Sequence, residues 1–262
     1  MTTTHLTFRS AIVRPPAGNF ADGLTTQELG APSYEKALEQ HAAYCQALRR
    51  CGLELTELPA DPDYPDSTFV EDTAILTPRG AILARPGADS REGEVGAIRP
   101  VLAIFYDRLA EISAPGTLDG GDICEAGEHF FIGVSERTNE AGAGQLAQYL
   151  KGLGYTSALV DIRGVPGILH LKSGIASLGD GRLALIDTLA DHQAFRGYEV
   201  IHLEPQENYA ANCVRVNDYV LIAAGFPRFQ QALEAAGYQP LPLEMSEYQK
   251  MDGGLSCLSL RF

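Results

Sequence analysis

Helical and extended patterns alternate along the chain, and the same order recurs. Three amphipathic, helix-like stretches end in a glycine and run directly into an extended stretch. These are residues 47–52 before 53–55, residues 149–154 before 155–156, and residues 232–237 before 238–239. A glycine after the last turn is a common helix C-cap, because it adopts the left-handed conformation at low cost. The pattern therefore predicts repeated helix–strand units.

Each unit also has a polar loop that leads into a second extended stretch. We expect these second strands at residues 68–77, 122–133, 174–186, 212–224 and 255–262. Their starts lie about 40 to 50 residues apart, a period typical of repeated supersecondary modules. Helices that alternate with strands over short gaps indicate an α/β fold. The chain thus predicts five βαβ-like modules in a single domain, residues 1–262.

The two ends of the chain suit a closed ring of these modules. The first predicted strand, residues 8–13, would complete the last module and close the ring. Radial repetition of this kind leaves a central channel that is lined by loops from every module. We therefore expect a five-module α/β propeller with a central active-site channel, where residues far apart in sequence meet.

A cysteine near the C-terminus, Cys257, is the first candidate for chemistry. A glycine pair, Gly253-Gly254, precedes it, and the alternation over residues 255–260 predicts that it lies on a strand. A thiol beyond a glycine pair can be presented where a ligand approaches the backbone. Taken alone, Cys257 is better interpreted as a small buried hydrophobe, as most free cysteines are.

Acidic, histidine and cysteine residues stand at equivalent places where successive modules open. They are Asp66, Glu71 and Asp72, then Asp119 and Asp122 around Gly120-Gly121, then His170, and finally Cys257. Each has an ordinary interpretation alone, as a turn, a solvated loop, a helix cap or a core histidine. Two adjacent carboxylates that lead into a buried strand are nevertheless costly unless they bind something positive. In a ring, all of these residues would converge on one axis.

Cysteine, histidine and carboxylates together suit attack on a cationic carbon. The thiolate is the nucleophile, and an imidazolium or a cationic ligand beside it lowers the pKa of the thiol. A histidine can protonate a leaving amine and then activate water. Carboxylates hold a planar guanidinium through charge-assisted hydrogen bonds.

Net charge narrows the choice of partner. The formal net charge is −14, which argues against nucleic acid because phosphate would be repelled. Such a charge favours the approach of a cationic small molecule, although it can also serve solubility alone. We expect no nucleic-acid partner.

Cysteine spacing and apolar runs narrow the class of protein. The five cysteines show no CxxC pair or Cys/His cluster with zinc-ligand spacing, so we expect reduced thiols, no metal and no cofactor. A thiolate beside a histidine can capture zinc as an inhibitor. Residues 1–5 lack the features of a signal peptide, and no apolar run is long enough to span a membrane. We expect a cytoplasmic location.

Five motifs, taken in this order, resemble the dimethylarginine dimethylaminohydrolase family of the guanidine-modifying pentein superfamily. They are residues 69–72 (FVED), 118–122 (LDGGD), 135–139 (SERTN), 170–173 (HLKS) and 253–257 (GGLSC). The resemblance runs from about Phe8 to the C-terminus. It implies a five-module α/β propeller, and it implies hydrolysis of asymmetric dimethylarginine and monomethylarginine to citrulline and an alkylamine through a covalent thiouronium on cysteine.

The resemblance also implies a role for each matching residue. Cys257 would be the nucleophile, His170 the general acid and then the general base, and Asp119 the residue that orients and charge-stabilises His170. Substrate binding is implied for Asp66, Glu71 and Asp72 at the guanidinium, Arg91 and Arg137 at the α-carboxylate, and the backbone carbonyls of Leu24 and Met251 at the α-amino end. Leu24 would lie on a loop that covers the site, and the space around Phe69 and Met251 would affect substrate preference. Arg85 competes with Arg91 for the same role.

Some alternatives stay open. The same site could act on arginine, agmatine or another guanidine, as in arginine deiminases, but these usually carry an acid where this chain has Lys172. Asp119 stands where many relatives have glutamate, and this shorter acid reaches less far towards His170. A related ring serves as a ribosome-binding factor without catalysis, which the acidic charge and the coincident Cys, His and acid set argue against. A homodimer is one option for assembly.

Overall fold

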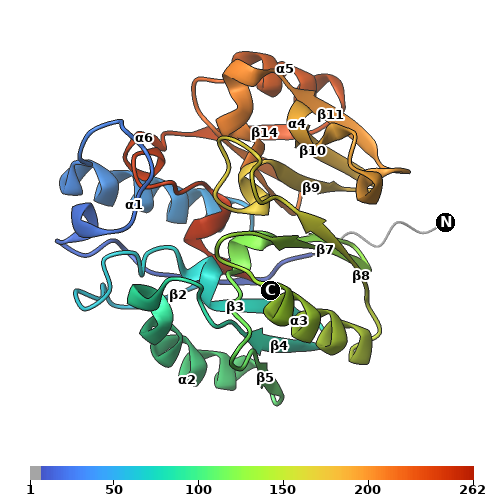
Figure 1. The fold of residues 1–262 in the computed structure, drawn as a ribbon. Helices are drawn as coiled ribbons and strands as arrows, with labels where there is room; N and C mark the ends of the chain where they lie inside the picture. Colours follow the sequence, from blue (N-terminus) through green and yellow to red (C-terminus); the bar gives the residue numbers. More distant parts are fainter. Residues whose placement is uncertain (1–6) are drawn as a thin grey trace.

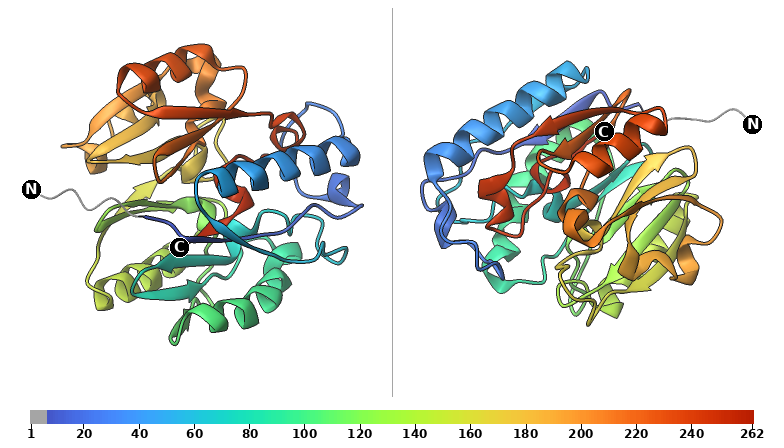
Figure 2. Two further views of the ribbon diagram at one scale, coloured as in Figure 1. Left: turned by 180° about the vertical axis from the view of Figure 1, so that it is seen from behind. Right: turned by 90° about the horizontal axis from the view of Figure 1, so that it is seen from above.

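The computed structural model describes residues 7–262, which form five three-stranded sheets of identical topology (Figures 1 and 2). In each sheet the first two strands are antiparallel, and the third strand lies parallel to the second. The sheets are β15–β1–β2 (Leu260–Arg261, Ser10–Val13, Glu54–Glu57), β3–β4–β5 (Ala74–Thr77, Gly80–Leu83, Leu109–Glu111), β6–β7–β8 (Ile123–Ala126, His129–Val134, Thr156–Asp161), β9–β10–β11 (Ile175–Gly179, Arg182–Ile186, Glu199–Leu203) and β12–β13–β14 (Val214–Val216, Tyr219–Ala223, Gln239–Leu243). The predicted five-module α/β fold is confirmed.

The two ends of the chain close the ring, as predicted. Strand β1 pairs antiparallel with β15 through Ala11↔Arg261 and Ile12↔Leu260, and it pairs parallel with β2. First strands of neighbouring modules also contact one another, as β15 does with β3, β6 with β9, and β9 with β12. These strands therefore surround the central axis.

Helices connect the second and third strands of the modules. They are α1 (Tyr34–Arg50), α2 (Val95–Phe105), α3 (Glu140–Gly152) and α5 (Pro227–Ala235), while the fourth module has the shorter α4 (Asp187–Ala190) and η6 (Gln193–Phe195). The glycines predicted to cap α1, α3 and α5 have left-handed φ values of 93° at Gly52, 87° at Gly154 and 88° at Gly237. A side chain at these positions would be strained, so each glycine ends its helix.

Three of the five predicted second strands, those at 122–133, 174–186 and 212–224, are hairpins rather than single strands. The stretch 174–186, for example, contains β9 and β10, which are joined by a turn with φ of 53° at Asp180 and 74° at Gly181. Asn217 (φ 53°) and Gly127 (φ 71°) lie in the corresponding turns of two other modules. Positive φ at Gly, Asn or Asp is typical of tight hairpin turns.

The prediction of a strand around Cys257 was wrong. Residues Ser256–Leu258 form a short 3₁₀ helix, η8, and only Leu260–Arg261 pair as a strand. The Cys257 amide bonds to the carbonyl of Gly254 at 3.3 Å, while the Ser256 amide donates to Asn212 Oδ1 at 2.9 Å. These bonds fold the segment into a turn, because they satisfy its polar groups without a neighbouring strand.

Each module opens with such a 3₁₀ turn just before its first strand. These opening turns are η2 (Val70–Thr73), η4 (Gly120–Asp122), η5 (Leu171–Ser173), η7 (Pro205–Ala211) and η8. Turn η2 contacts η8 and η4, η4 contacts η5, and η5 contacts η7. The polar loops that the sequence placed at equivalent positions therefore meet at the centre of the ring.

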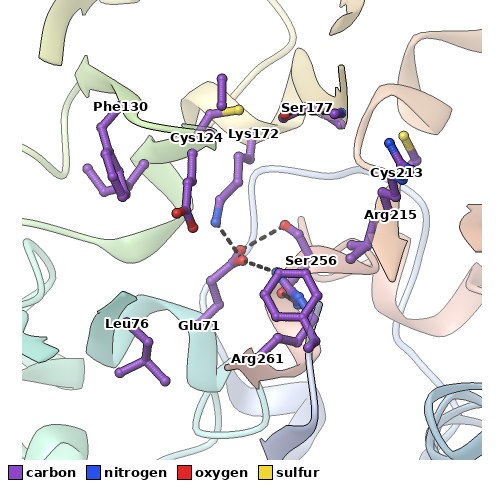
Figure 3. A pocket seen from close by; sticks show the side chains of 18 of the residues that line it. Glu71, Leu76, Cys124, Phe130, Lys172, Ser177, Cys213, Arg215, Ser256 and Arg261 are labelled. Carbon is purple, nitrogen blue, oxygen red and sulfur yellow. Dashed lines mark hydrogen bonds and ion pairs between the residues drawn. The ribbon is translucent and has the colours of Figure 1, made fainter. Parts of the chain in front are cut away.

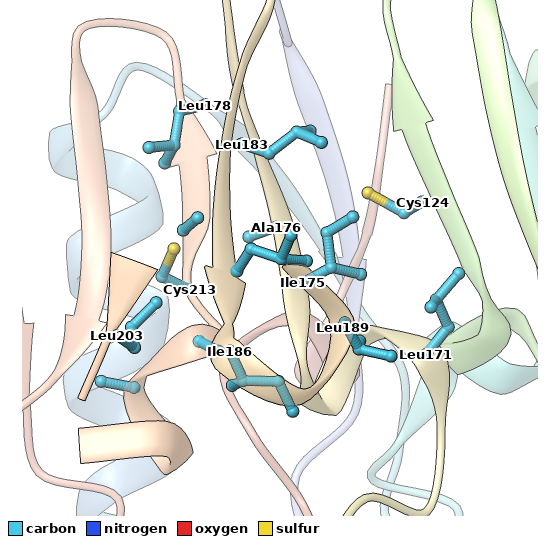
Figure 4. Close-up of a cluster of buried hydrophobic side chains, with 14 of the residues drawn as sticks. Cys124, Leu171, Ile175, Ala176, Leu178, Leu183, Ile186, Leu189, Leu203 and Cys213 are labelled. Atoms are coloured by element: carbon cyan, nitrogen blue, oxygen red, sulfur yellow. The ribbon is translucent and has the colours of Figure 1, made fainter. Parts of the chain in front are cut away.

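Apolar side chains pack between neighbouring modules. Leu171, Ile175 and Leu183 of the fourth module lie in a buried cluster that also contains Cys124 of the third module and Cys213 of the fifth (Figure 4). All five cysteines are buried free thiols. Among residues 7–262, no helix is long and apolar enough to cross a membrane. The signal-peptide prediction for residues 1–5 lies outside the described part of the chain.

Candidate active site

A small cavity of about 30 Å³ lies where the opening turns meet. Ten of the eleven residues predicted for the site line it: Leu24, Asp66, Phe69, Asp72, Arg91, Asp119, Arg137, His170, Met251 and Cys257. The remaining lining residues are Leu169, Asp252 and Gly253. Gly253 belongs to a motif recognised in the sequence, whereas Leu169 and Asp252 were not selected, although they stand next to His170 and Met251.

His170 and Asp119 form a buried pair on this cavity. His170 Nε2 lies 3.0 Å from Asp119 Oδ2, and the amide of Gly87 donates to Asp119 Oδ1 at 2.8 Å. The shorter acid at position 119 therefore does reach the imidazole. A Cβ on Gly121 would lie 2.8 Å from the His170 ring, so only glycine allows this close approach.

The surrounding acids keep His170 protonated. Burial alone would lower the pKa of the imidazole, but the charge of Asp72, the hydrogen bond with Asp119 and the charge of Asp122 raise it to about 9. At neutral pH His170 is therefore an imidazolium, the form that can donate a proton.

Asp72 is ionised and held firmly. Its Oδ1 accepts from the Gly121 amide at 2.8 Å, and its Oδ2 accepts from Arg91 Nη1 at 2.7 Å. Burial opposes its ionisation, but the charges of His170 and Arg91 together with these hydrogen bonds lower its pKa to about 2. A fixed carboxylate on the cavity wall suits a bound cation.

Cys257 is buried at the cavity, in the middle of η8. Burial, followed by the charges of Glu71 and Asp72, raises the pKa of its thiol to about 12, against a smaller opposite effect of the Gly254 amide and Lys172. The preceding glycines are needed for packing, because a Cβ on Gly253 would lie 2.3 Å from the Phe69 ring. Cys257 thus rests as a neutral thiol in a tightly packed loop.

Arg91 and Arg137, which were predicted to bind the α-carboxylate of the substrate, differ in how far their N–H donors are already engaged. Arg91 is buried and donates to Asp72, to both carboxylate oxygens of Glu94, and to the carbonyls of Asp66 and Phe69. Arg137 is half-buried on the cavity, and no ion pair is recorded for it within residues 7–262. Its guanidinium is therefore the better placed of the two to meet an incoming anion.

Arg85, the alternative to Arg91, does not line the cavity. Its Nη2 pairs with Glu92 at 2.9 Å, and its Nη1 donates to the carbonyl of Gly116 at 3.4 Å. Of the two arginines that the sequence left open, Arg91 is the one at the site.

Glu71 lies on the other side of the Cys257 loop. It borders a larger chamber of about 250 Å³ in the same ring, and its carboxylate contacts Lys172 Nζ (2.5 Å), the Ser256 hydroxyl (2.7 Å) and Arg261 Nη2 (3.3 Å) (Figure 3). Both of its oxygens are thus engaged. The predicted contact of Glu71 with a guanidinium stays a prediction. In the structure Glu71 pairs with Lys172, Ser256 and Arg261.

A loop with Leu24 lies over the cavity. The Leu24 amide donates to both oxygens of Asp66, at 3.2 and 3.1 Å. Thr26 and Gln27 donate to the carboxylate of Asp252, the residue that follows Met251. Leu24 itself is 41% exposed, which fits the predicted position on a covering loop.

Within residues 7–262, Asp72, Asp119 and His170 have potential metal-binding atoms within 4.8 Å of one another. The imidazole Nε2 already bonds to Asp119, and the carboxylate oxygens also accept hydrogen bonds from Arg91 and from two backbone amides. We therefore interpret this cluster as a charge network that orients and protonates the imidazole.

Comparison with known proteins agrees with this geometry. The family model described as arginine deiminase matches residues 60–163. The chain is 44% identical to the N(G),N(G)-dimethylarginine dimethylaminohydrolase of Pseudomonas aeruginosa over 256 residues, which cover 97% of this chain and 100% of the relative.

Two solved structures of dimethylarginine dimethylaminohydrolase superpose over nearly the whole chain. A cysteine-to-serine mutant of the Pseudomonas aeruginosa protein, in complex with citrulline, gives a TM-score of 0.95 at 43% identity and covers 98% of this chain and 100% of that one. A histidine-to-glycine variant, solved as an adduct with S-methyl-L-thiocitrulline, gives 0.94 at 43% identity and covers 97% and 100%.

Proposed function

The chain belongs to the dimethylarginine dimethylaminohydrolase family, and on this premise we propose that the cavity around Cys257 carries out the family's reaction. The reaction is hydrolysis of Nω-methylated arginine to citrulline and dimethylamine or methylamine. One observation carries the proposal: Cys257, His170, Asp119 and Asp72, supplied by four different modules, line one buried cavity. This is the set that attack on a guanidinium carbon requires.

In the proposed complex, charge orients the substrate along the cavity. Asp72, with Asp66 beside it, holds the guanidinium. Arg137, together with Arg91, faces the α-carboxylate. The carbonyls of Leu24 and Met251 accept from the α-amino group under the covering loop, and Phe69 lies against the side chain. All these groups line the cavity, and several are fixed by the hydrogen bonds described above, so little ordering is needed on binding.

The reaction then proceeds in two steps. Cys257 Sγ attacks the guanidinium carbon as a thiolate, and the alkylated nitrogen leaves after it takes the proton of His170, which produces an S-alkylthiouronium. His170, now neutral, removes a proton from water as the water attacks the same carbon. The C–S bond then breaks as the hydroxyl proton of the tetrahedral intermediate passes to solvent, so that citrulline forms and the Cys257 thiolate is released. Asp119 keeps the imidazole aimed throughout through its 3.0 Å contact.

The resting thiol predicts a characteristic pH dependence. Because burial and the nearby acids raise the pKa of Cys257 to about 12, alkylation of the free enzyme by iodoacetamide will be slow at pH 7 and will still accelerate above pH 9. The rate is measured as loss of activity, with mass spectrometry to locate the label on Cys257. A rate that levels off below pH 8 would reveal a resting thiolate and contradict this expectation.

A cationic ligand should lower the raised pKa of the Cys257 thiol. A bound guanidinium places positive charge beside Sγ, so the pKa of the thiol falls and the thiolate appears at lower pH. The ultraviolet absorbance of thiolate should therefore rise when an arginine analogue saturates the enzyme at pH 8, and a Cys257→Ser control should show no change. Equal absorbance with and without the analogue would contradict ligand-induced ionisation.

Substrate choice is tested by citrulline release from a panel. We expect turnover of asymmetric dimethylarginine and monomethylarginine. Agmatine lacks the α-carboxylate, and the loss of its charged contact with Arg137 should lower kcat/KM about 10- to 100-fold in a matched comparison with arginine. Equal or better use of agmatine would show that Arg91 and Arg137 are misassigned.

Hydrolysis of unmodified arginine is the second candidate, favoured by the arginine deiminase match. Activity on arginine alone would support the proposed reaction mechanism but refute methylated arginine as the substrate. Lys172 argues for the methylated substrates, because its ammonium binds Glu71 at 2.5 Å where a deiminase would place a second acid.

Three coarser features complete the proposal. The five modules act as one domain over residues 1–262, the protein resides in the cytoplasm, and a homodimer is one option for its assembly. These remain predictions from the sequence. Size-exclusion chromatography with light scattering tests the assembly, and cell fractionation tests the location.

A further inference from the structure

The ring has five opening turns, and four of them supply residues to the proposed reaction. Turn η2 carries Asp72, η4 and η5 are preceded by Asp119 and His170, and η8 carries Cys257. The fifth turn, η7, is followed directly by Asn212, which was not selected from the sequence. Asn212 is buried, with 8% of its surface exposed, and its side chain reaches Cys257.

Asn212 contacts the Cys257 loop at two points. Its Oδ1 accepts from the Ser256 amide at 2.9 Å, and its Nδ2 lies 3.9 Å from Cys257 Sγ as a donor. The bond from the Ser256 amide fixes the orientation, because a flipped amide would place its NH₂ group against another N–H donor. The amide hydrogens therefore face the sulfur.

A second donor approaches the same sulfur from the loop itself. The Gly254 amide donates to Cys257 Sγ at 3.4 Å. The two donors are packed together, since a Cβ on Gly254 would lie 2.4 Å from Asn212 Cγ. Glycine at position 254 thus allows the side chain of Asn212 to reach its place.

We propose that Asn212 is a catalytic residue that donates its side-chain N–H to the Cys257 sulfur and, with the Gly254 amide, stabilises the attacking thiolate. The role of Asn212 in the reaction rests on the proposed function, whereas its effect on the Cys257 thiol does not. Burial and the acids at Glu71 and Asp72 disfavour charge on this sulfur, so fixed donors offset part of that cost. Such donors need no rearrangement when charge develops.

The same donors serve both halves of the reaction. Sγ carries negative charge before it attacks the guanidinium carbon, and it carries that charge again when the C–S bond breaks. A donor that is held in place by Ser256 stabilises the sulfur at both moments. The contact also limits rotation of the thiol and so directs the sulfur towards the cavity.

Two substitutions separate donation from simple support of the loop. Asn212→Asp keeps an oxygen for the Ser256 amide but replaces the donor with an acceptor, whereas Asn212→Ala removes both contacts. We expect both variants to lower kcat about 10- to 100-fold. Both should also slow iodoacetamide alkylation of Cys257 about tenfold at fixed pH, the effect of a thiol pKa one unit higher. If Asn212→Ala fails to fold, Asn212→Asp alone decides.

Asn217→Ala is the matched control. Asn217 is also an amide that links distant backbone, since it bonds to Phe8 and to the carbonyl of Cys51, but it does not line the cavity. It should lower the melting temperature and leave the alkylation profile of Cys257 unchanged. Unchanged alkylation profiles in both Asn212 variants would overturn the proposal and leave Asn212 as a support of the loop. Wild-type enzyme that released no citrulline would refute the proposed function instead, since alkylation requires no substrate.

Discussion

Cys257→Ser will lower the rate of citrulline formation by about 10⁴-fold or more. A serine hydroxyl is far less ionised than a thiol near neutral pH, and the cavity offers His170 as an imidazolium with a pKa raised to about 9, which is not a base for the hydroxyl. Without the thiolate, the thiouronium intermediate cannot form. Citrulline release from asymmetric dimethylarginine, with purified wild type in parallel, measures the effect.

Binding should survive this substitution. The charged groups proposed to hold the substrate lie on other elements of the cavity wall, and a cysteine-to-serine mutant of the Pseudomonas aeruginosa relative was solved with citrulline bound. We expect citrulline to raise the melting temperature of the variant about as much as that of the wild type. Loss of both turnover and binding would indicate that the loop has collapsed and would not support a purely chemical role.

Another buried thiol provides the control for Cys257→Ser. Cys45 lies in α1 near His41 and does not line the cavity, and it is also a buried free cysteine. Cys45→Ala should leave citrulline formation unchanged and reduce stability slightly, as expected when a small buried group is removed. A near-normal rate in Cys257→Ser would refute the nucleophile assignment.

The ring itself was predictable because its signals are local. Left-handed glycines after α1, α3 and α5 mark helix ends in any sequence, and the recurrence of one order of elements predicts equivalent modules. Ring closure by residues 8–13 followed from the unpaired first strand, and β1 pairs with β15 as expected. Each of these features depends on neighbours within one module or on the repeat.

The turn at Cys257 was not predictable in the same way. Alternation over residues 255–260 is compatible with a strand, and the partners that select a 3₁₀ turn instead are distant in sequence. The Ser256 amide needs Asn212, and the Ser256 hydroxyl needs Glu71. A six-residue pattern carries no trace of either contact, so tertiary hydrogen bonds overrode the local preference.

The residues of the candidate site also divide into those that a local motif predicts and those that depend on distant parts of the chain. Residues within recognisable motifs reached the cavity, among them Asp72, Asp119 and His170. Glu71 belongs to the same motif as Asp72 but faces Lys172 and Arg261, because adjacent residues in η2 point in different directions. Asn212 stands in no motif, and its importance depends on atoms of residues 256 and 257 that only the folded ring brings near.

His170→Ala will lower kcat about 10²- to 10⁴-fold, the usual contribution of a general acid–base residue. The loss arises twice, because an amine leaves slowly without a proton and water attacks slowly without a base. S-methyl-L-thiocitrulline separates these steps, since its thiol leaving group depends less on protonation. We therefore expect this compound to label Cys257 in the variant and the adduct to persist in mass spectra, as a histidine-to-glycine variant of the family was solved as such an adduct.

The pH profile links this loss to the imidazole itself. Acid catalysis by His170 requires the protonated ring, so wild-type kcat should be sustained below pH 9 and fall as pH rises through the pKa of about 9. His170→Ala should lose this alkaline decline along with its rate. His202→Ala is the matched control, because His202 is an exposed histidine that contacts Asp187 and does not line the cavity, and it should keep both the rate and the decline. If His170→Ala turned over without stalling at the adduct, or kept the same alkaline decline, then another group would supply the proton and Asp119 would orient the imidazole for a different purpose.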